Sequence, residues 1–152
     1  MKSLENPECK AEIVERIGRL QPDSPRLWGR MTAAQMVCHL SDSFLGVMGE
    51  RPISPAPGFY PRAAFKWLAL YAPFQWPKGV ATRPEVDQQI GGTPPAEFEE
   101  DKRCLLVLIE QFTRTPRNFS FQAHPMFREM SERDWMRWGY LHPDHHLRQF
   151  GN

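Results

Sequence analysis

Residues 141–150 read LHPDHHLRQF and hold three of the five histidines in this 152-residue chain. A helix turns by about 100° per residue, so His142 and His146 lie on the same face. Trp135 and Trp138 precede them on nearly the same face, which directs both imidazoles toward the interior of the fold. Histidines four residues apart on a buried helix face have the spacing of metal ligands.

The same stretch contains a proline inside a predicted helix. Proline removes one backbone hydrogen bond and crowds the carbonyl four residues earlier. For Pro143 that carbonyl belongs to Gly139, and a glycine there lets the helix bend. We therefore predict one helix over residues 131–150, capped by Ser131 and kinked at the proline. His145, about 100° from position 146, is expected to face solvent or to support the pair.

Four further helices are predicted from apolar residues that recur every three or four positions. They cover residues 7–20, 32–48, 62–72 and 93–113. The second has the clearest start, because Thr32 and Gln35 form a capping box. Thr93 is expected to cap the last of them, with Pro94 in its first turn.

The 15 prolines of the chain fall mainly between these helices. Residues 51–61 and 73–92 are therefore expected to be loops, and the second is long enough to suggest a functional or covering loop. Residues 118–121 alternate in the manner of a short strand. The pattern predicts an all-α bundle with long Pro-rich loops, in a single domain over residues 1–152.

Charge and cysteine content exclude several classes of protein. The chain has 19 basic and 18 acidic residues, a net charge of +1, so no strong field attracts nucleic acid. Its three cysteines are far apart, which argues against a disulfide framework and a zinc knot. We find neither an apolar signal core nor a run of about 18 apolar residues. We expect a cytoplasmic protein with no membrane span.

A metal site needs a third ligand from another helix. His39 is the only other histidine on a strongly amphipathic helix, and three imidazoles with an open fourth position are typical of catalytic zinc sites. Two simpler interpretations stay open at this point. His39 could be an ordinary core histidine, and the pair at 142 and 146 could be surface groups near the negative end of a helix dipole.

Four other residues are candidates for roles near this site. Asp42 could orient an imidazole or activate water, or it could be a solvated surface acid. His124 could approach the mouth of the site, or it could be a loop histidine bonded to backbone. Gln149, nearly one turn beyond position 146, could line the cavity and bind a cofactor. Cys38 is expected to be a buried, inert thiol.

Aromatic residues crowd the first half of the chain and its loops. We favour packing as their role, with an apolar substrate pocket or a dimer face as alternatives. They are Trp28, Phe59, Tyr60, Trp67, Tyr71, Phe74 and Trp76.

Two motifs resemble a known superfamily. The segment MTAAQM at 31–36 with His39, and HPDHHLRQ at 142–149, resemble the two metal-binding helices of the DinB/YfiT-like superfamily. HPMF at 124–127, Trp135 and HHLRQFG at 145–151 resemble its branch called domain of unknown function 1569. The resemblance implies an up-down four-helix bundle, often a homodimer.

The resemblance also implies a function. It implies one divalent ion, which we expect to be zinc or nickel, on His39, His142 and His146. Some members of the superfamily are transferases or isomerases that use a low-molecular-weight thiol, whereas this branch has no assigned reaction. We expect a metal-dependent enzyme, of thiol transferase or hydrolase type, that acts on a small molecule. The alternative is a non-enzymatic metal-binding or stress-related interaction protein.

Overall fold

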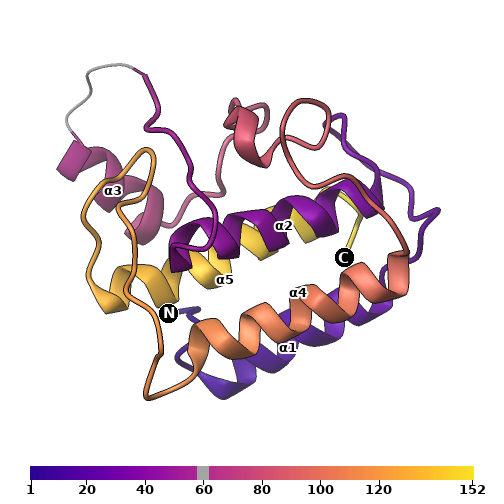
Figure 1. The fold of residues 1–152 in the computed structure, drawn as a ribbon. Coiled ribbons are helices and arrows are strands. Elements are labelled where there is room, and N and C mark those ends of the chain that lie inside the picture. Colours follow the sequence, from indigo (N-terminus) through magenta and orange to yellow (C-terminus); the bar gives the residue numbers. More distant parts are fainter. Residues whose placement is uncertain (58–61) are drawn as a thin grey trace.

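The computed structural model describes residues 1–57 and 62–152 and shows five α-helices and no strand in that part of the chain (Figure 1). The helices are α1 (Pro7–Arg19), α2 (Ala33–Met48), α3 (Arg62–Tyr71), α4 (Phe98–Thr113) and α5 (Glu132–Arg148). A single 3-10 turn, η1 (Pro84–Val86), lies between α3 and α4. The expected loop at 51–61 is non-helical up to residue 57. Its last four residues, with Phe59 and Tyr60, lie outside the described part.

The long helices α1, α2, α4 and α5 pack side by side as a bundle, with α3 near the start of α5 (Figure 1). Two contacts show that α1 and α5 run parallel. The Tyr140 hydroxyl donates to Glu12 at 2.9 Å, and one turn later in both helices Arg16 donates to Asp144 at 2.8 Å. Helix α2 runs antiparallel to α5. No helix in the described residues is both long and apolar enough to cross a membrane.

The direction of α4 differs from the expected up-down order. Cys38 lies near Asp101 and Phe44 lies near Phe112, so later residues of α2 meet later residues of α4 and the two helices are parallel. A strict up-down order is wrong here, because residues 62–97 return along the bundle before α4 begins (Figure 1).

The core lies between the four long helices and is built largely from aliphatic and aromatic side chains. At its centre Phe44, Phe112 and Trp138 meet edge to face or tilted, with ring centroids 5.0 to 6.3 Å apart. Fully burying each large apolar side chain contributes about 1.5–3 kcal/mol. This packing fixes how α2 faces α5, the two helices that carry the histidines.

Two of the three predicted helix caps are confirmed, and one is wrong. The capping box of Thr32 with Gln35 is present, and Ser131 caps α5 in the same way with Asp134. The predicted cap at Thr93 is wrong, since α4 begins five residues later, after Glu97. Two consecutive prolines follow Thr93, and a residue before proline is pushed out of the helical region.

The predicted strand at 118–121 is also wrong, because this segment has no partner strand in the described part of the chain. Phe119 and Phe121 instead pack edge to face at 5.2 Å, and Phe121 stacks on Trp135 at 5.3 Å. The next residue, Gln122, donates its backbone N–H to Val47 at the end of α2. Aromatic packing therefore explains the alternating pattern.

Helix α5 continues unbroken through Pro143. Gly139 has a packing role in the structure. A Cβ atom at this position would lie 2.8 Å from side-chain carbons of both Leu4 and Phe112. The glycine therefore allows the N-terminal segment and α4 to approach α5 closely.

Candidate metal centre

Three histidines from two helices converge in the bundle. His39 comes from α2, and His142 and His146 come from successive turns of α5. The Nε2 atom of His142 lies 3.3 Å from Nε2 of His39 and 3.1 Å from Nε2 of His146. Ligands at about 2.0–2.1 Å from a tetrahedral ion lie about 3.3–3.4 Å apart. These two distances suit nitrogen ligands of one ion, and ligand atoms of all three histidines lie within 4.8 Å of one another.

The outer nitrogens of two of these rings are held by hydrogen bonds. Nδ1 of His39 donates to the backbone carbonyl of Val86 at 2.7 Å, and Nδ1 of His146 donates to Oε1 of Gln149 at 2.6 Å. A neutral imidazole carries a single proton, so a donor at Nδ1 leaves Nε2 with a lone pair. Both bonds therefore turn lone pairs toward the shared centre.

The centre is short of protons for an ordinary hydrogen-bonded cluster. With lone pairs on Nε2 of His39 and His146, neutral His142 offers one proton between two acceptors. At least one of these two Nε2 acceptors therefore has no proton to accept, and an unpaired acceptor in a buried site costs free energy. Nδ1 of His142 is buried and has no hydrogen-bond partner among the described residues. A cation shared by the three Nε2 atoms would satisfy this donor set.

Burial keeps these rings in the state that binds metal. Removal from water lowers the pKa of His39, and it lowers the pKa values of His142 and His146 well below the ordinary range. The neighbouring imidazoles lower the pKa of His142 further, because each would repel a second positive charge. At neutral pH all three rings are therefore neutral, as metal ligands must be.

The loop before α4 is tied to α2 by a buried ion pair. Asp42 is 1% exposed, and its carboxylate accepts from the backbone and hydroxyl of Thr93, each at 2.7 Å, and from the Gln88 side chain at 2.8 Å. Arg51 lies 3.1 Å from the same carboxylate and donates to the Glu85 carbonyl at 2.8 Å. These contacts hold the turn that presents the Val86 carbonyl to His39.

The structure changes what was expected of Asp42. The carboxylate is buried, so the interpretation as a solvated surface acid is wrong. The contact that orients His39 comes from the Val86 carbonyl. No residue-type pattern could reveal this contact, because every residue has a backbone carbonyl. The sequence offered one indication, because the length of the 73–92 segment suggested a covering loop. The later part of this segment, which contains Val86, does cover His39.

His124 lies in the loop before α5, and its Nδ1 accepts from the backbone N–H groups of Met126 and Phe127, both at 3.1 Å. Its ring also stacks on Phe127 at 4.3 Å. Burial lowers the pKa of His124 to about 3. This geometry matches the alternative of a loop histidine bonded to backbone.

Two other neighbours lie close to the cluster in different ways. Gln149 is behind His146, where its side chain orients that ring. His145 is 8% exposed, so the solvent-facing interpretation is wrong, and its ring packs edge to face on Trp28 at 4.9 Å. Cys38 is buried as expected, and burial raises the pKa of its thiol to about 12.

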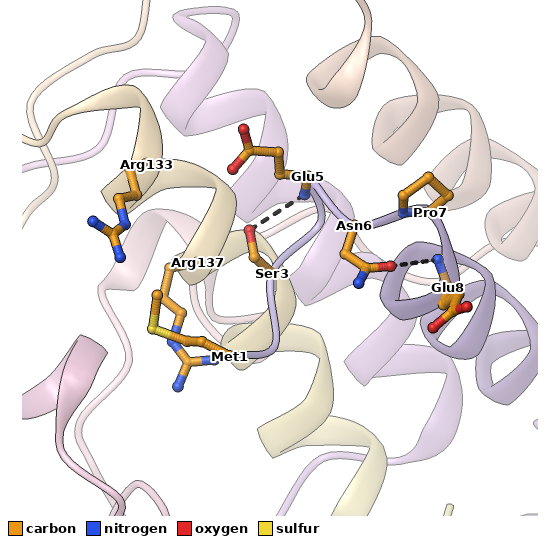
Figure 2. A pocket seen from close by; sticks show the side chains of 8 residues that line it. All are labelled: Met1, Ser3, Glu5, Asn6, Pro7, Glu8, Arg133 and Arg137. Carbon is orange, nitrogen blue, oxygen red and sulfur yellow. Dashed lines mark hydrogen bonds between the residues drawn. The ribbon is translucent and has the colours of Figure 1, made fainter.

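Among the hollows on the described surface are two that are not lined by a histidine of the cluster. The larger, about 750 Å³, lies between the first eight residues and the start of α5, where Arg133 and Arg137 face it (Figure 2). Arg133 precedes His142 by nine residues, about 14 Å along the helix. The smaller, about 350 Å³, lies beside the cluster and is lined by Trp76 and His145.

The fold and the site together define an all-α protein with a buried cluster of three histidines that could hold a metal. The family described as protein of unknown function (DUF1569) matches residues 2–152, and the chain belongs to this family. No curated protein and no solved structure matches the chain.

Proposed function

We propose that this protein binds one divalent metal ion through His39, His142 and His146. The observation that carries the proposal is the convergence of three Nε2 atoms while Val86 and Gln149 hold the opposite nitrogens of two rings. Imidazole nitrogens suit zinc and nickel. The placement of both ligand-bearing helices also supports membership of the DinB/YfiT-like superfamily.

We propose further that the ion serves catalysis on a small molecule. Three protein ligands leave a fourth position, where a bound ion lowers the pKa of water or of a thiol and so generates a nucleophile. The described residues around the cluster supply aromatic walls, from Trp76 and Trp138, that limit access of bulk water. A thiol transferase or a hydrolase would both use this arrangement.

A non-enzymatic metal-binding protein is the second candidate. It is favoured by one observation: the hollows at the N-terminal segment and beside Trp76 are not lined by a histidine of the cluster. Access to the fourth position therefore decides between the two functions. Turnover assays with zinc- or nickel-loaded protein, low-molecular-weight thiols and small electrophiles test this. A thiol-dependent rate that disappears in His142→Ala supports the enzyme, whereas background rates across the panel support the second candidate.

The metal site itself is tested by elemental analysis and calorimetry. Wild-type protein is expected to retain about one zinc or nickel ion per chain, and His142→Ala much less. The matched control is His145→Ala, which removes a buried imidazole that lies outside the cluster. At a metal concentration of 100 times Kd, binding stabilises the fold by about 2.7 kcal/mol. The melting temperature should therefore rise by about 5–11 °C.

Equal metal content in wild type and His142→Ala contradicts the assignment. Circular dichroism of each variant establishes that the helices are intact. If His142→Ala fails to fold, His39→Gln gives a second test, because it keeps a polar side chain of similar length without an imidazole.

A further inference from the structure

The smaller hollow has two indole walls and a basic rim. Trp28 and Trp76 line it, together with Lys78, His145 and Arg148. The Trp76 indole N–H donates to the Ala69 carbonyl at 2.7 Å, which fixes that wall. The Lys78 ammonium lies 5.3 Å above the Trp28 ring. Flat apolar walls and a few charged groups at the edge are typical of small-molecule sites.

The charge of this hollow favours an anion. Its lining contains no acidic side chain, and its basic groups are Lys78 and Arg148. Arg148 pairs with Asp144 at 3.0 Å, but Asp144 also pairs with Arg16 at 2.8 Å. Arg16 also lies 3.4 Å from Glu12, so these two arginines and two carboxylates balance one another, and the excess positive charge at the hollow is the ammonium of Lys78. Such basic groups suit a carboxylate.

An unsatisfied polar atom also belongs to this hollow. Nδ1 of His145 is buried and has no hydrogen-bond partner among the residues that the structure describes. Buried polar atoms are nearly always paired in folded proteins, and a ligand is one source of the missing partner. His145 is among the residues that line the hollow.

The hollow also lies directly beside the histidine cluster. The Trp76 ring is 6.1 Å from that of His142, and the His145 ring is 5.2 Å from that of His146, measured between centroids. Trp76 and His145, which line the hollow, therefore lie next to the proposed metal ligands His142 and His146. A molecule bound there is one ring away from the centre where the three Nε2 atoms meet.

We propose that this hollow binds a small aromatic carboxylate, with its ring between Trp28 and Trp76 and its carboxylate at Lys78 and Arg148. As the substrate class of the metal centre, this inference rests on the function proposed above. Binding of the carboxylate itself requires only the hollow and no metal. The volume, about 350 Å³, lies at the small end of ligand sites and fits a single-ring molecule.

Calorimetry with metal-free protein tests the inference, and phenylacetate is the probe. Two compounds serve as controls: 2-phenylethylammonium has the same ring with the opposite charge, and acetate has no ring. Phenylacetate is expected to bind at least tenfold more tightly than either control. Lys78→Ala is expected to weaken phenylacetate binding about tenfold, because it removes a charge-assisted contact.

The matched control variant is Arg114→Ala, which removes the same charge from an exposed residue that caps the C-terminal end of α4 and does not line the hollow. It should bind phenylacetate as wild type does. Equal affinity for phenylacetate and 2-phenylethylammonium, unchanged affinity in Lys78→Ala, or absence of binding at millimolar phenylacetate would each overturn the inference. Melting curves for both variants establish that they are folded.

The test separates the two proposals. If wild type retains metal but phenylacetate does not bind, the carboxylate site is wrong and the metal site stands. If metal-free protein binds phenylacetate but the metal content of wild type equals that of His142→Ala, the metal site is wrong. The hollow is then a carboxylate site without an adjacent ion.

Discussion

At the scale of single residues, the position of one proton on each imidazole decides what the cluster can bind. The Val86 carbonyl and the Gln149 amide oxygen keep that proton on Nδ1 of His39 and His146. Partners behind metal-binding histidines fix the tautomer and raise the basicity of the ligand. Gln149 is therefore a positioning residue for the centre.

Replacing Gln149 tests this role. Gln149→Ala removes the acceptor of His146 and should weaken metal binding about 10–100-fold, as loss of such partners generally does. Gln149→Glu keeps an oxygen at this position and should retain affinity close to that of wild type. Competition titration against a chelator measures both. Equal affinity in Gln149→Ala and wild type would show that the hydrogen bond has no effect on the ion.

The three histidines could be predicted from sequence, whereas their partners could be predicted only in part. Spacing put His142 and His146 on one face, and His39 was the only other histidine on a strongly amphipathic helix. Helix periodicity brought Gln149 near the site but could not tell a cavity-lining residue from one behind a ring. The Val86 contact depends on how a long loop folds over α2, which local patterns do not determine.

At the scale of elements, the loop before α4 acts as a support for α2. Arg51 contacts the Asp42 carboxylate and two backbone carbonyls of this loop, those of Glu85 and Gly91. The guanidinium presents several donors in a fixed plane, so one side chain can tie several groups together. The geometry of His39 therefore depends on Arg51 through the loop that carries Val86.

Arg51→Gln should accordingly weaken metal binding. The truncated side chain cannot hold the loop, so the acceptor of His39 loses its fixed position, and we expect a loss of about tenfold in metal affinity. Arg83→Gln is the matched control, because Arg83 belongs to the same loop region but donates to Ser54 at 2.6 Å. Zinc calorimetry on both variants measures the difference. Comparable losses in the two would show general loosening of the loop instead.

The starts and directions of the helices could be predicted only where they depend on residues close together in the sequence. The capping box at Thr32 and the cap at Ser131 each involve residues three positions apart, and both predictions are confirmed. The direction of α4 depends on the path of the described residues 62–97, and Thr93, the expected cap, is instead bonded to Asp42 of α2. Both depend on contacts between residues far apart in sequence.

At the scale of the whole molecule, buried histidines make stability depend on pH. Burial lowers the pKa of His124 to about 3, against an ordinary value of 6.5. The unfolded chain therefore binds a proton below pH 6.5 that the folded chain does not bind until about pH 3. Stability from this group is complete above pH 6.5 and falls as the pH decreases through that window.

His124→Asn isolates this contribution. The amide oxygen of asparagine can accept from the Met126 and Phe127 N–H groups, but it does not titrate. The free energy of unfolding of metal-free wild type should fall between pH 6 and pH 4.5 more steeply than that of the variant, by up to about 1.4 kcal/mol per pH unit. Urea unfolding at several pH values measures both slopes. Parallel curves would mean that His124 is protonated equally in the folded and unfolded states.

The homodimer that the family resemblance implies stays a prediction. Sedimentation velocity, compared with the chain mass of 17.7 kDa, tests it directly.

The indole rings beside His142 have a consequence for identifying the ion. Trp138 lies 4.9 Å and Trp76 lies 6.1 Å from that imidazole, measured between ring centroids. At such range a paramagnetic ion such as nickel or copper quenches indole emission, whereas zinc, with its filled d shell, does not. The protein therefore carries its own optical reporter, and its emission spectrum on titration separates the metals without any label.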